Sequence, residues 1–106
     1  MNSEHRRLRV FLDDVRPAPD GWTLVRWPSE AIALLETGEV EELSLDHDLG
    51  DDQITGYDVL AWIEEAVALR GFRPPPIAIH SANPVGRERM TRALESIRRF
   101  AEGGEK

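Results

Sequence analysis

Cysteine is absent from the sequence and lysine occurs once, so several chemistries are excluded at the outset. Without cysteine the chain forms no disulfide and offers no thiolate as a nucleophile or a metal ligand. The one lysine is Lys106, and every other strongly basic residue is an arginine. A glycine-rich loop that holds phosphates with a lysine is therefore missing, as is the GxSxG pattern of serine hydrolases.

Long apolar runs are also missing. No stretch approaches the roughly 20 residues that cross a bilayer, and the opening "MNSEHRRLRV" lacks the apolar centre of a signal peptide. We therefore expect a cytoplasmic protein without a membrane partner. The 106 residues are 41% hydrophobic and 31% charged, which is typical of one globular domain. We expect that domain at residues 8–100, with flexible tails at 1–7 and 101–106.

The net charge of −7 argues against general coating of nucleic acid. The charge is distributed unevenly, because residues 1–69 hold 16 acids and 5 arginines, whereas residues 70–106 hold 8 bases and 4 acids. One interpretation is a solvated basic helix beside an ordinary acidic surface. The other is an acidic half that holds a cation next to a basic half that holds phosphate.

Apolar runs and helical spacing alternate along the chain. We expect strands at 8–14, 22–27, 40–46 and 77–83, and helices at 28–38, at 55–71 and from 84 onward. The segments between the first two strands and at 47–54 are rich in proline, glycine or aspartate and predict loops. This order predicts an α/β fold, a three-layer sandwich around a short, mainly parallel sheet of about four strands.

Capping residues indicate where the helices begin and end. Serine, threonine and asparagine side chains accept hydrogen bonds from the first backbone N–H groups of a helix, and glycine commonly ends one. The expected start signals are Ser29, the capping-box pair Thr55 and Asp58, and Asn83 followed by Pro84, and the expected stops are Gly38 and Gly71.

The chain has three tryptophans, Trp22, Trp27 and Trp62. Large aromatic side chains in a short domain usually pack in its core or at the rim of the core. We therefore interpret all three as packing residues and expect none of them to form a platform on which bases stack.

Polar residues follow three of the expected strands. In open parallel sheets ligands bind outside the carboxyl ends of the strands, so these residues should share one crevice. Each cluster also has a structural explanation, as a turn, a cap or a satisfied buried histidine. The clusters are Asp13 with Asp14; Asp46, His47 and Asp48; and His80, Ser81 and Asn83.

The carboxylates of this edge predict a metal site. Asp13, Asp14 and Asp46 in one crevice would repel one another and raise each other's pKa. A hard divalent cation with oxygen ligands removes that conflict, and Mg²⁺ typically uses one or two carboxylates together with water and phosphate. We therefore expect Mg²⁺ as a cofactor that polarises a phosphoryl oxygen or orients a water molecule.

Two of the three histidines, His47 and His80, fall at the same edge. Imidazoles titrate near neutral pH, so the pair can act as general base and general acid on a phosphodiester. Asp48 either orients an imidazole or shapes the loop that follows. Arg16 and Arg87 are candidates to bind phosphate oxygens, and the alternative for both is an ordinary surface ion pair.

This arrangement resembles a response-regulator receiver domain. The resemblance implies that Asp13 and Asp14 are its metal-binding pair. It also implies that Asp46 is the phosphoacceptor and Ser81 the switch hydroxyl. The chain departs from receivers in having a loop after the first strand, no fifth strand–helix unit and no lysine near the site, so the implied topology is a truncated receiver-like, or flavodoxin-like, one.

A divergent offshoot, the cyclic-phosphate-processing receiver-like domain, is a closer match over residues 8 to 100. The segments that carry the resemblance are "VFLDDVRP", "LSLDHDLG", "TGYDVLAWI" and "IHSANPVGRERM". The resemblance implies a metal-assisted phosphoesterase that acts on cyclic phosphates, including the 2′,3′-cyclic phosphate of nucleotides or of RNA ends in RNA repair. Catalysis would then fall to His47, His80, Asp46 and Asp48, and substrate phosphate would be bound by Arg16, Ser81, Asn83 and Arg87.

Two other functions are compatible with the sequence. One is a signalling receiver that is phosphorylated on Asp46, although the missing lysine and the shortened fold count against it. The other is a non-catalytic binding module that has kept the acidic crevice. In each case the absent fifth strand leaves a sheet edge that could pair with a second copy of the chain to form a homo-oligomer.

Overall fold

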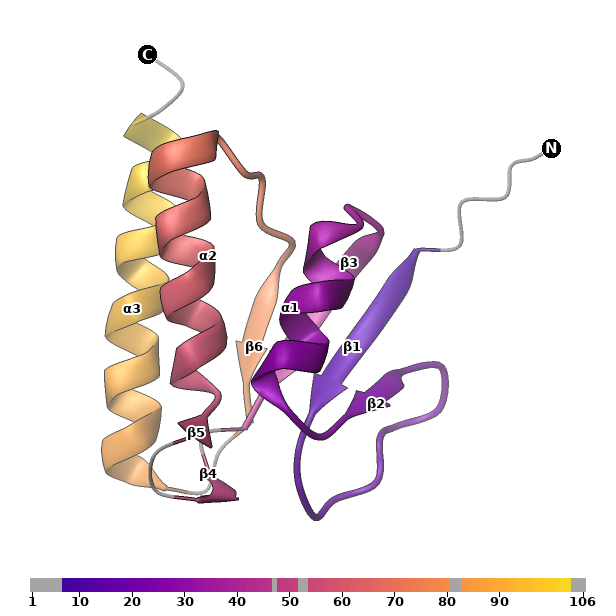
Figure 1. Ribbon diagram of the computed structural model, residues 1–106. Coiled ribbons are helices and arrows are strands. Elements are labelled where there is room, and N and C mark those ends of the chain that lie inside the picture. Colours follow the sequence, from indigo (N-terminus) through magenta and orange to yellow (C-terminus); the bar gives the residue numbers. More distant parts are fainter. Residues whose placement is uncertain (1–6, 47, 52–53, 81–82, 104–106) are drawn as a thin grey trace, which may run out of the picture.

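A computed structural model of the chain describes residues 7–46, 48–51, 54–80 and 83–103. Its main sheet has the order β2-β1-β3-β6, and all of its strands are parallel (Figure 1). The elements in chain order are β1 (Leu8–Leu12), β2 (Thr23–Val25), α1 (Pro28–Glu36), β3 (Val40–Leu45), β4 (Asp48–Asp51), β5 (Ile54–Thr55), α2 (Tyr57–Arg70), β6 (Ile77–Ile79) and α3 (Pro84–Gly103).

One face of the sheet is apolar and forms the core together with the helices. Alternate side chains of a strand point to opposite faces, and the register pairs Val10 with Leu43 and Leu12 with Leu45 on the same face. All four side chains are at most 1% exposed. The helices add Ala31 and Leu35 from α1, Val59, Leu60, Ile63 and Val67 from α2, and Met90, Ala93 and Ile97 from α3.

The opposite face of the sheet is not covered by any described helix. It carries the exposed side chains of Arg9 and Ala78, with Phe11 and Ser44 on the same face. None of these residues belongs to the core that the helices form. The expected α/β class and four-stranded parallel sheet are confirmed, but the expected three-layer sandwich is wrong in its layer count, because the described elements make two layers.

The direction of the connections explains why one face is bare. The connections from β2 to β3 and from β3 to β6 run in the same direction across the sheet, so right-handed crossovers bring α1 and α2 to the same face. The connection from β1 to β2 runs the other way, and a helix there would cover the opposite face. Its residues form a loop, as the prolines predict.

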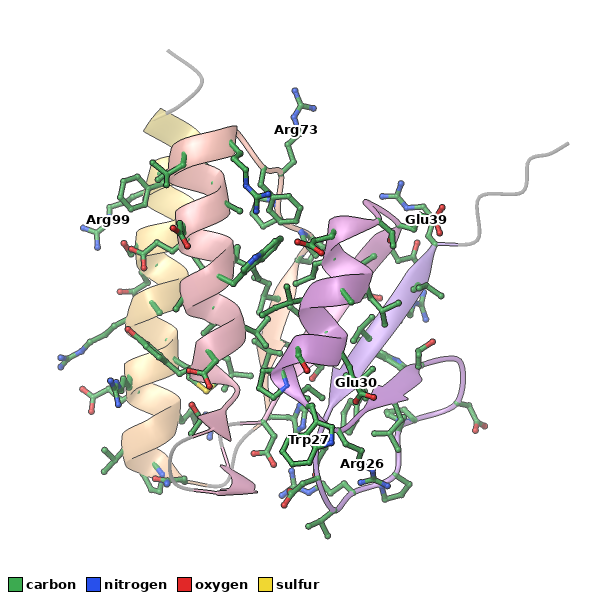
Figure 2. All side chains as sticks on the ribbon, in the orientation of Figure 1. Arg26, Trp27, Glu30, Glu39, Arg73 and Arg99 are labelled. Carbon is green, nitrogen blue, oxygen red and sulfur yellow. The ribbon has the colours of Figure 1, made fainter. Side chains whose placement is uncertain are left out.

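The start of α1 corrects one capping prediction. Ser29 is not the N-cap, because the helix already begins at Pro28. A proline suits the first helical position, where its fixed φ is favourable and its missing N–H is not needed. The carboxylate of Glu30 accepts hydrogen bonds from the backbone N–H groups of Arg26 and Trp27 at 2.9 and 3.1 Å, and Figure 2 labels these three residues.

The other two helix starts follow the sequence signals. The side-chain oxygen of Asn83 accepts hydrogen bonds from the N–H groups of Val85 and Gly86 at 3.0 and 3.1 Å. At the start of α2 the backbone N–H of Thr55 donates to the carboxylate of Asp58 at 3.3 Å. The cap at Asn83 is confirmed. The predicted Thr55–Asp58 capping box is only half formed, because the N-cap of α2 is Gly56 and the hydroxyl of Thr55 accepts from the N–H of Tyr57.

Two segments differ from the sequence expectation. Residues 47–54 were expected as a loop, but the part of them that the structure describes contains β4, which pairs antiparallel with β5. Helix α3 continues to Gly103, three residues beyond the expected end of the domain at residue 100. The glycine stops are confirmed, since Gly38 and Gly71 follow their helices with φ of 77° and 67°.

The described helices include none with the length and apolar composition needed to cross a membrane. Strands β2 and β6 are the outer strands of the main sheet. The pairing of an outer strand with a second copy of the chain stays a prediction.

A glycine is required at position 56, just before α2, because there is no room for a side chain there and not because of its backbone conformation. Its φ of −61° is open to any residue. A Cβ added there would collide with the backbone carbonyl oxygen of Asp46 and lie 3.1 Å from the terminal methyl carbon of Met90. The first turn of α2 therefore packs directly against the chain at the end of β3.

Replacing Gly56 with alanine should lower the free energy of unfolding by about 1–3 kcal/mol, because the added methyl group overpacks this contact. Urea denaturation measures the loss. The variant should also shift the backbone amide resonance of Asp46. Gly38→Ala is the matched control, since Gly38 has a positive φ but nothing within 4 Å of an added Cβ. If both variants leave the Asp46 resonance in place, the close contact does not exist.

Candidate functional site

Three ionisable side chains meet at the carboxyl edge of the sheet. Asp13, Asp46 and His80 follow the adjacent strands β1, β3 and β6, and each offers a ligand atom within 4.8 Å of the others. Asp46 and His80 continue the ladder beyond the strands, since their N–H groups donate to the carbonyls of Leu12 and Leu45. The period of two places all three on the sheet face that the helices leave bare.

The ring of His80 is held on three sides. It stacks on Phe11, with ring centroids 4.2 Å apart and planes inclined by 4°. Its Nδ1 lies 2.7 Å from Oγ of Ser44, and its Nε2 lies 3.0 Å from Oδ2 of Asp13. An ionised carboxylate only accepts, so Nε2–H donates to Asp13, and the hydroxyl of Ser44 is the partner of Nδ1. These contacts fix the orientation of the ring.

The carboxylate of Asp13 is buried, with 1% of the side chain exposed, and is surrounded by donors. Its Oδ1 accepts hydrogen bonds from the backbone N–H groups of Val15 and Arg16, each at 2.9 Å, which closes the turn after β1. Its Oδ2 faces His80 and lies 3.6 Å from the guanidinium of Arg16. The same guanidinium donates to the backbone carbonyl of His80 at 3.0 Å, so Arg16 links the ends of β1 and β6.

Hydrogen bonds determine the charge state of Asp13. Burial alone would raise the pKa of its carboxyl, because desolvation disfavours the charged form. The hydrogen bonds from Arg16 and Val15, together with the contact to His80, outweigh burial and hold the pKa of Asp13 below its ordinary value. The carboxylate is therefore ionised at neutral pH, and so offers a charged oxygen to a cation.

The other site residues predicted from the sequence are only partly described by the structure. Asp14 is half-buried and is not a member of the three-residue cluster. Asn83 caps α3, and the N–H of the exposed Arg87 donates to its backbone carbonyl. The backbone of Asp48 forms the start of β4. His47, Ser81 and the side chain of Asp48 lie outside the described residues.

Sequence reasoning missed three residues that organise the cluster. Phe11 and Ser44 each stand two positions before a site aspartate, so the period of a strand places them on its face and could have identified them. Arg26 donates to the backbone carbonyl of Asp13 at 3.2 Å. Nothing local in the sequence reveals that contact, because it depends on how β2 pairs with β1.

Comparisons with known proteins give one family and one solved structure. Residues 8–96 match the family described as the Cyclic-phosphate processing Receiver domain, a range that runs from β1 into α3. The crystal structure of the signal receiver domain of a protein described as a Luxo repressor from Vibrio parahaemolyticus is similar over 92% of this chain and 95% of its own, with 20% identity and a TM-score of 0.42. No curated protein matches the chain.

The lowered pKa of Asp13 predicts how stability depends on pH. A depressed carboxyl pKa stabilises the fold above the unfolded value of about 3.9, and this contribution is lost as the pH falls through the folded value. We expect Asp13→Asn to lower the free energy of unfolding by about 1.5–3 kcal/mol at neutral pH, the range for hydrogen bonds to charged groups. The difference from the unmodified chain should shrink below a pH of about 4.

Urea denaturation at neutral pH and through the acid range measures that difference. Asp20→Asn is the matched control, because Asp20 is exposed in the same loop. Its effect should stay within about 0.5 kcal/mol at every pH. A cost of Asp13→Asn that is independent of pH would contradict the ionised, hydrogen-bonded carboxylate.

Proposed function

The chain belongs to the cyclic-phosphate processing receiver domain family, and on this premise we propose that it is a metal-assisted phosphoesterase that opens cyclic phosphates. The proposed substrates are 2′,3′-cyclic phosphates of nucleotides or of RNA ends. One observation carries the proposal beyond the family: two buried aspartates and an imidazole converge at the carboxyl edge of the sheet, with their ligand atoms within 4.8 Å of one another.

The donor set fits a divalent cation. Asp13 and Asp46 are buried carboxylates, at 1% and 8% exposed, and two negative charges held so close are stabilised by a cation between them. A bound cation would polarise a phosphoryl oxygen and favour attack by water. We propose Mg²⁺ as the cofactor, with Asp14, the residue after Asp13, as a further oxygen ligand.

The contacts of His80 favour different roles for His80 and His47. Both ring nitrogens of His80 already have partners, so the ring is better suited to orienting Asp13, or to holding a cation once its proton moves from Nε2 to Nδ1, than to transferring a proton to substrate. Ser44 supports this role, because its hydroxyl can accept as well as donate and so can anchor either tautomer of the ring. We assign acid–base chemistry to His47, with Asp48 as its orienting partner.

Phosphate oxygens of the substrate would meet donors from two elements. Arg16 has a half-exposed side chain beside Asp13, so part of its guanidinium remains open to an anion. Arg87 lies in the first turn of α3, where the helix end also favours anions. We propose these two arginines, with Ser81 and Asn83 from the preceding segment, as the substrate-binding groups.

A signalling receiver phosphorylated on Asp46 is the second candidate. It is supported by the position of Asp46 at the end of β3, beside the acidic residues that follow β1. A small labelled phosphodonor discriminates between the two functions. Stable acyl-phosphate on Asp46 without hydrolysis of any cyclic phosphate would replace the esterase by a receiver. A chain that does neither would be a binding module.

Turnover of a panel of 2′,3′-cyclic nucleotides with Mg²⁺ or Mn²⁺ tests the esterase directly. We expect ring opening to a phosphomonoester, detected by chromatography or by ³¹P NMR. Asp46→Asn should abolish it, and His47→Ala should slow it by about 10²–10⁴-fold, the usual contribution of a general acid or base. Asp20→Asn should leave the rate unchanged. If the whole panel stays intact with every cation tried, the proposal fails.

Cation selectivity tests the role of His80. An imidazole ligand favours Mn²⁺ over Mg²⁺, which prefers oxygen ligands. His80→Ala should therefore weaken Mn²⁺ binding by at least about tenfold and Mg²⁺ binding much less, as measured by isothermal titration calorimetry after treatment with a chelator. Equal losses for both cations would show that His80 acts only through Asp13 and is not a ligand.

A further inference from the structure

A large cavity lies at the end of the molecule opposite to the candidate site. It has a volume of about 660 Å³ and lies where α2 and α3 end and β6 begins. Figure 1 shows these three points together at the upper end of the view, whereas β6 points toward the lower end. Small-molecule sites usually have volumes of about 300–1,000 Å³, so the cavity has room for a ligand of that kind.

The walls of this cavity are mainly apolar. Gly71 ends α2 in the left-handed conformation, with φ of 67°, and the chain then leads to β6 through three successive prolines at 74–76. Their rings fix φ and leave no N–H group to be satisfied, so this wall is stiff. The larger apolar side chains that line the cavity are Val67, Phe72, Ile77, Leu94, Ile97 and Phe100. Such walls suit the apolar part of a ligand.

The neighbours of Phe72 hold its ring in place. Trp62 meets this ring edge-on, with ring centroids 5.4 Å apart, and the guanidinium of Arg70 lies 5.2 Å from the centroid of Trp62. The N–H of Phe72 donates to the carbonyl of Ala66 at 3.2 Å. Trp62 thus packs as the sequence predicts, whereas Trp27, also predicted to pack, is 50% exposed. A wall that is ordered beforehand loses little freedom when a ligand binds.

Two arginines line the same cavity without an acidic partner. Arg73 belongs to the segment before β6, and Arg98 lies near the end of α3. The chain has 20 acidic residues, yet none of the described residues that line the cavity is acidic. In the described part of the chain no carboxylate forms an ion pair with either guanidinium, whereas Arg9 pairs with Glu42. The cavity is therefore complementary to an anion.

We infer that this cavity is a binding site for a small amphiphilic carboxylate. The apolar part of the ligand would lie against Phe72, Ile77 and Leu94. The carboxylate would be bound by Arg73 and Arg98, because the planar guanidinium matches its two oxygens. A carboxylate carries one negative charge and a phosphate monoester about two, so the carboxylate costs less to bring against apolar walls. The site is separate from the carboxyl edge of the sheet and does not rest on the proposed function.

NMR titration of the ¹⁵N-labelled chain tests this site. The probes are octanoate, 1-octanol, which lacks the charge, and acetate, which lacks the apolar chain, all below the concentration at which octanoate forms micelles. We expect octanoate to bind most tightly of the three. It should shift the amide resonances of Gly71, Phe72, Ile77 and Ala101, which line the cavity, and leave that of Asp13 in place.

The same titrations on variants separate the charged from the apolar contribution. Arg73→Gln and Arg98→Gln should each weaken octanoate binding by about two- to fivefold, the usual effect of one exposed ion pair, and leave 1-octanol binding unchanged. Phe100→Ala should weaken the binding of both, because it removes part of the apolar wall. Arg92→Gln is the matched control, since Arg92 pairs with Glu88 at 2.9 Å. The dispersion of the amide spectrum verifies that each variant is folded.

Several outcomes would overturn the inference. Octanoate that leaves the cavity resonances in place would do so, as would equal binding of acetate and octanoate or an equal effect of Arg92→Gln and the cavity variants. Cavity resonances that shift with protein concentration alone would assign the cavity to a second copy of the chain. Shifts with a peptide of glutamate and leucine, but not with octanoate, would assign it to a protein partner. Turnover of cyclic phosphates enters none of these measurements.

Discussion

The buried carboxylate of Asp13 is the group on which the arrangement of the site depends. It ends β1, closes the following turn through two backbone N–H groups and receives the Nε2–H of His80 from the end of β6. A carboxylate so deeply buried is tolerated because each of its oxygens has donors. The same hydrogen bonds that satisfy it connect the ends of β1 and β6, so they contribute both to the charge of the site and to the stability of the fold.

The site also depends on the sheet face that no described helix covers. In a sheet with helices on both faces, Phe11, Ser44 and His80 would lie beneath a helix. Here the loop between β1 and β2 takes the place of that helix, and Phe11 and Ser44 are nevertheless buried, while the side chain of His80 is 19% exposed. Stacking on Phe11 and the contact with Ser44 restrict the ring of His80 on this face without a covering helix.

The site combines two aspartates with an imidazole on a receiver-like scaffold. Acidic residues that follow two strands suit a cation and a phosphoryl group, both in an esterase and in a receiver. In this chain an imidazole follows β6 and is held between Ser44 and Asp13.

The sequence alone determined the elements and the edge at which polar groups collect, because strand period, capping residues and prolines act over a few positions. It predicted the loop after β1, the cap at Asn83 and the convergence of Asp13, Asp46 and His80, but not the short strands β4 and β5. Tertiary structure decided the layer count, the partners of His80 and the exposure of Trp27. Ser44 and His80 are 36 positions apart, and only the pairing of β3 with β6 brings them together. Exposure likewise depends on what the rest of the chain leaves uncovered, which no local pattern encodes.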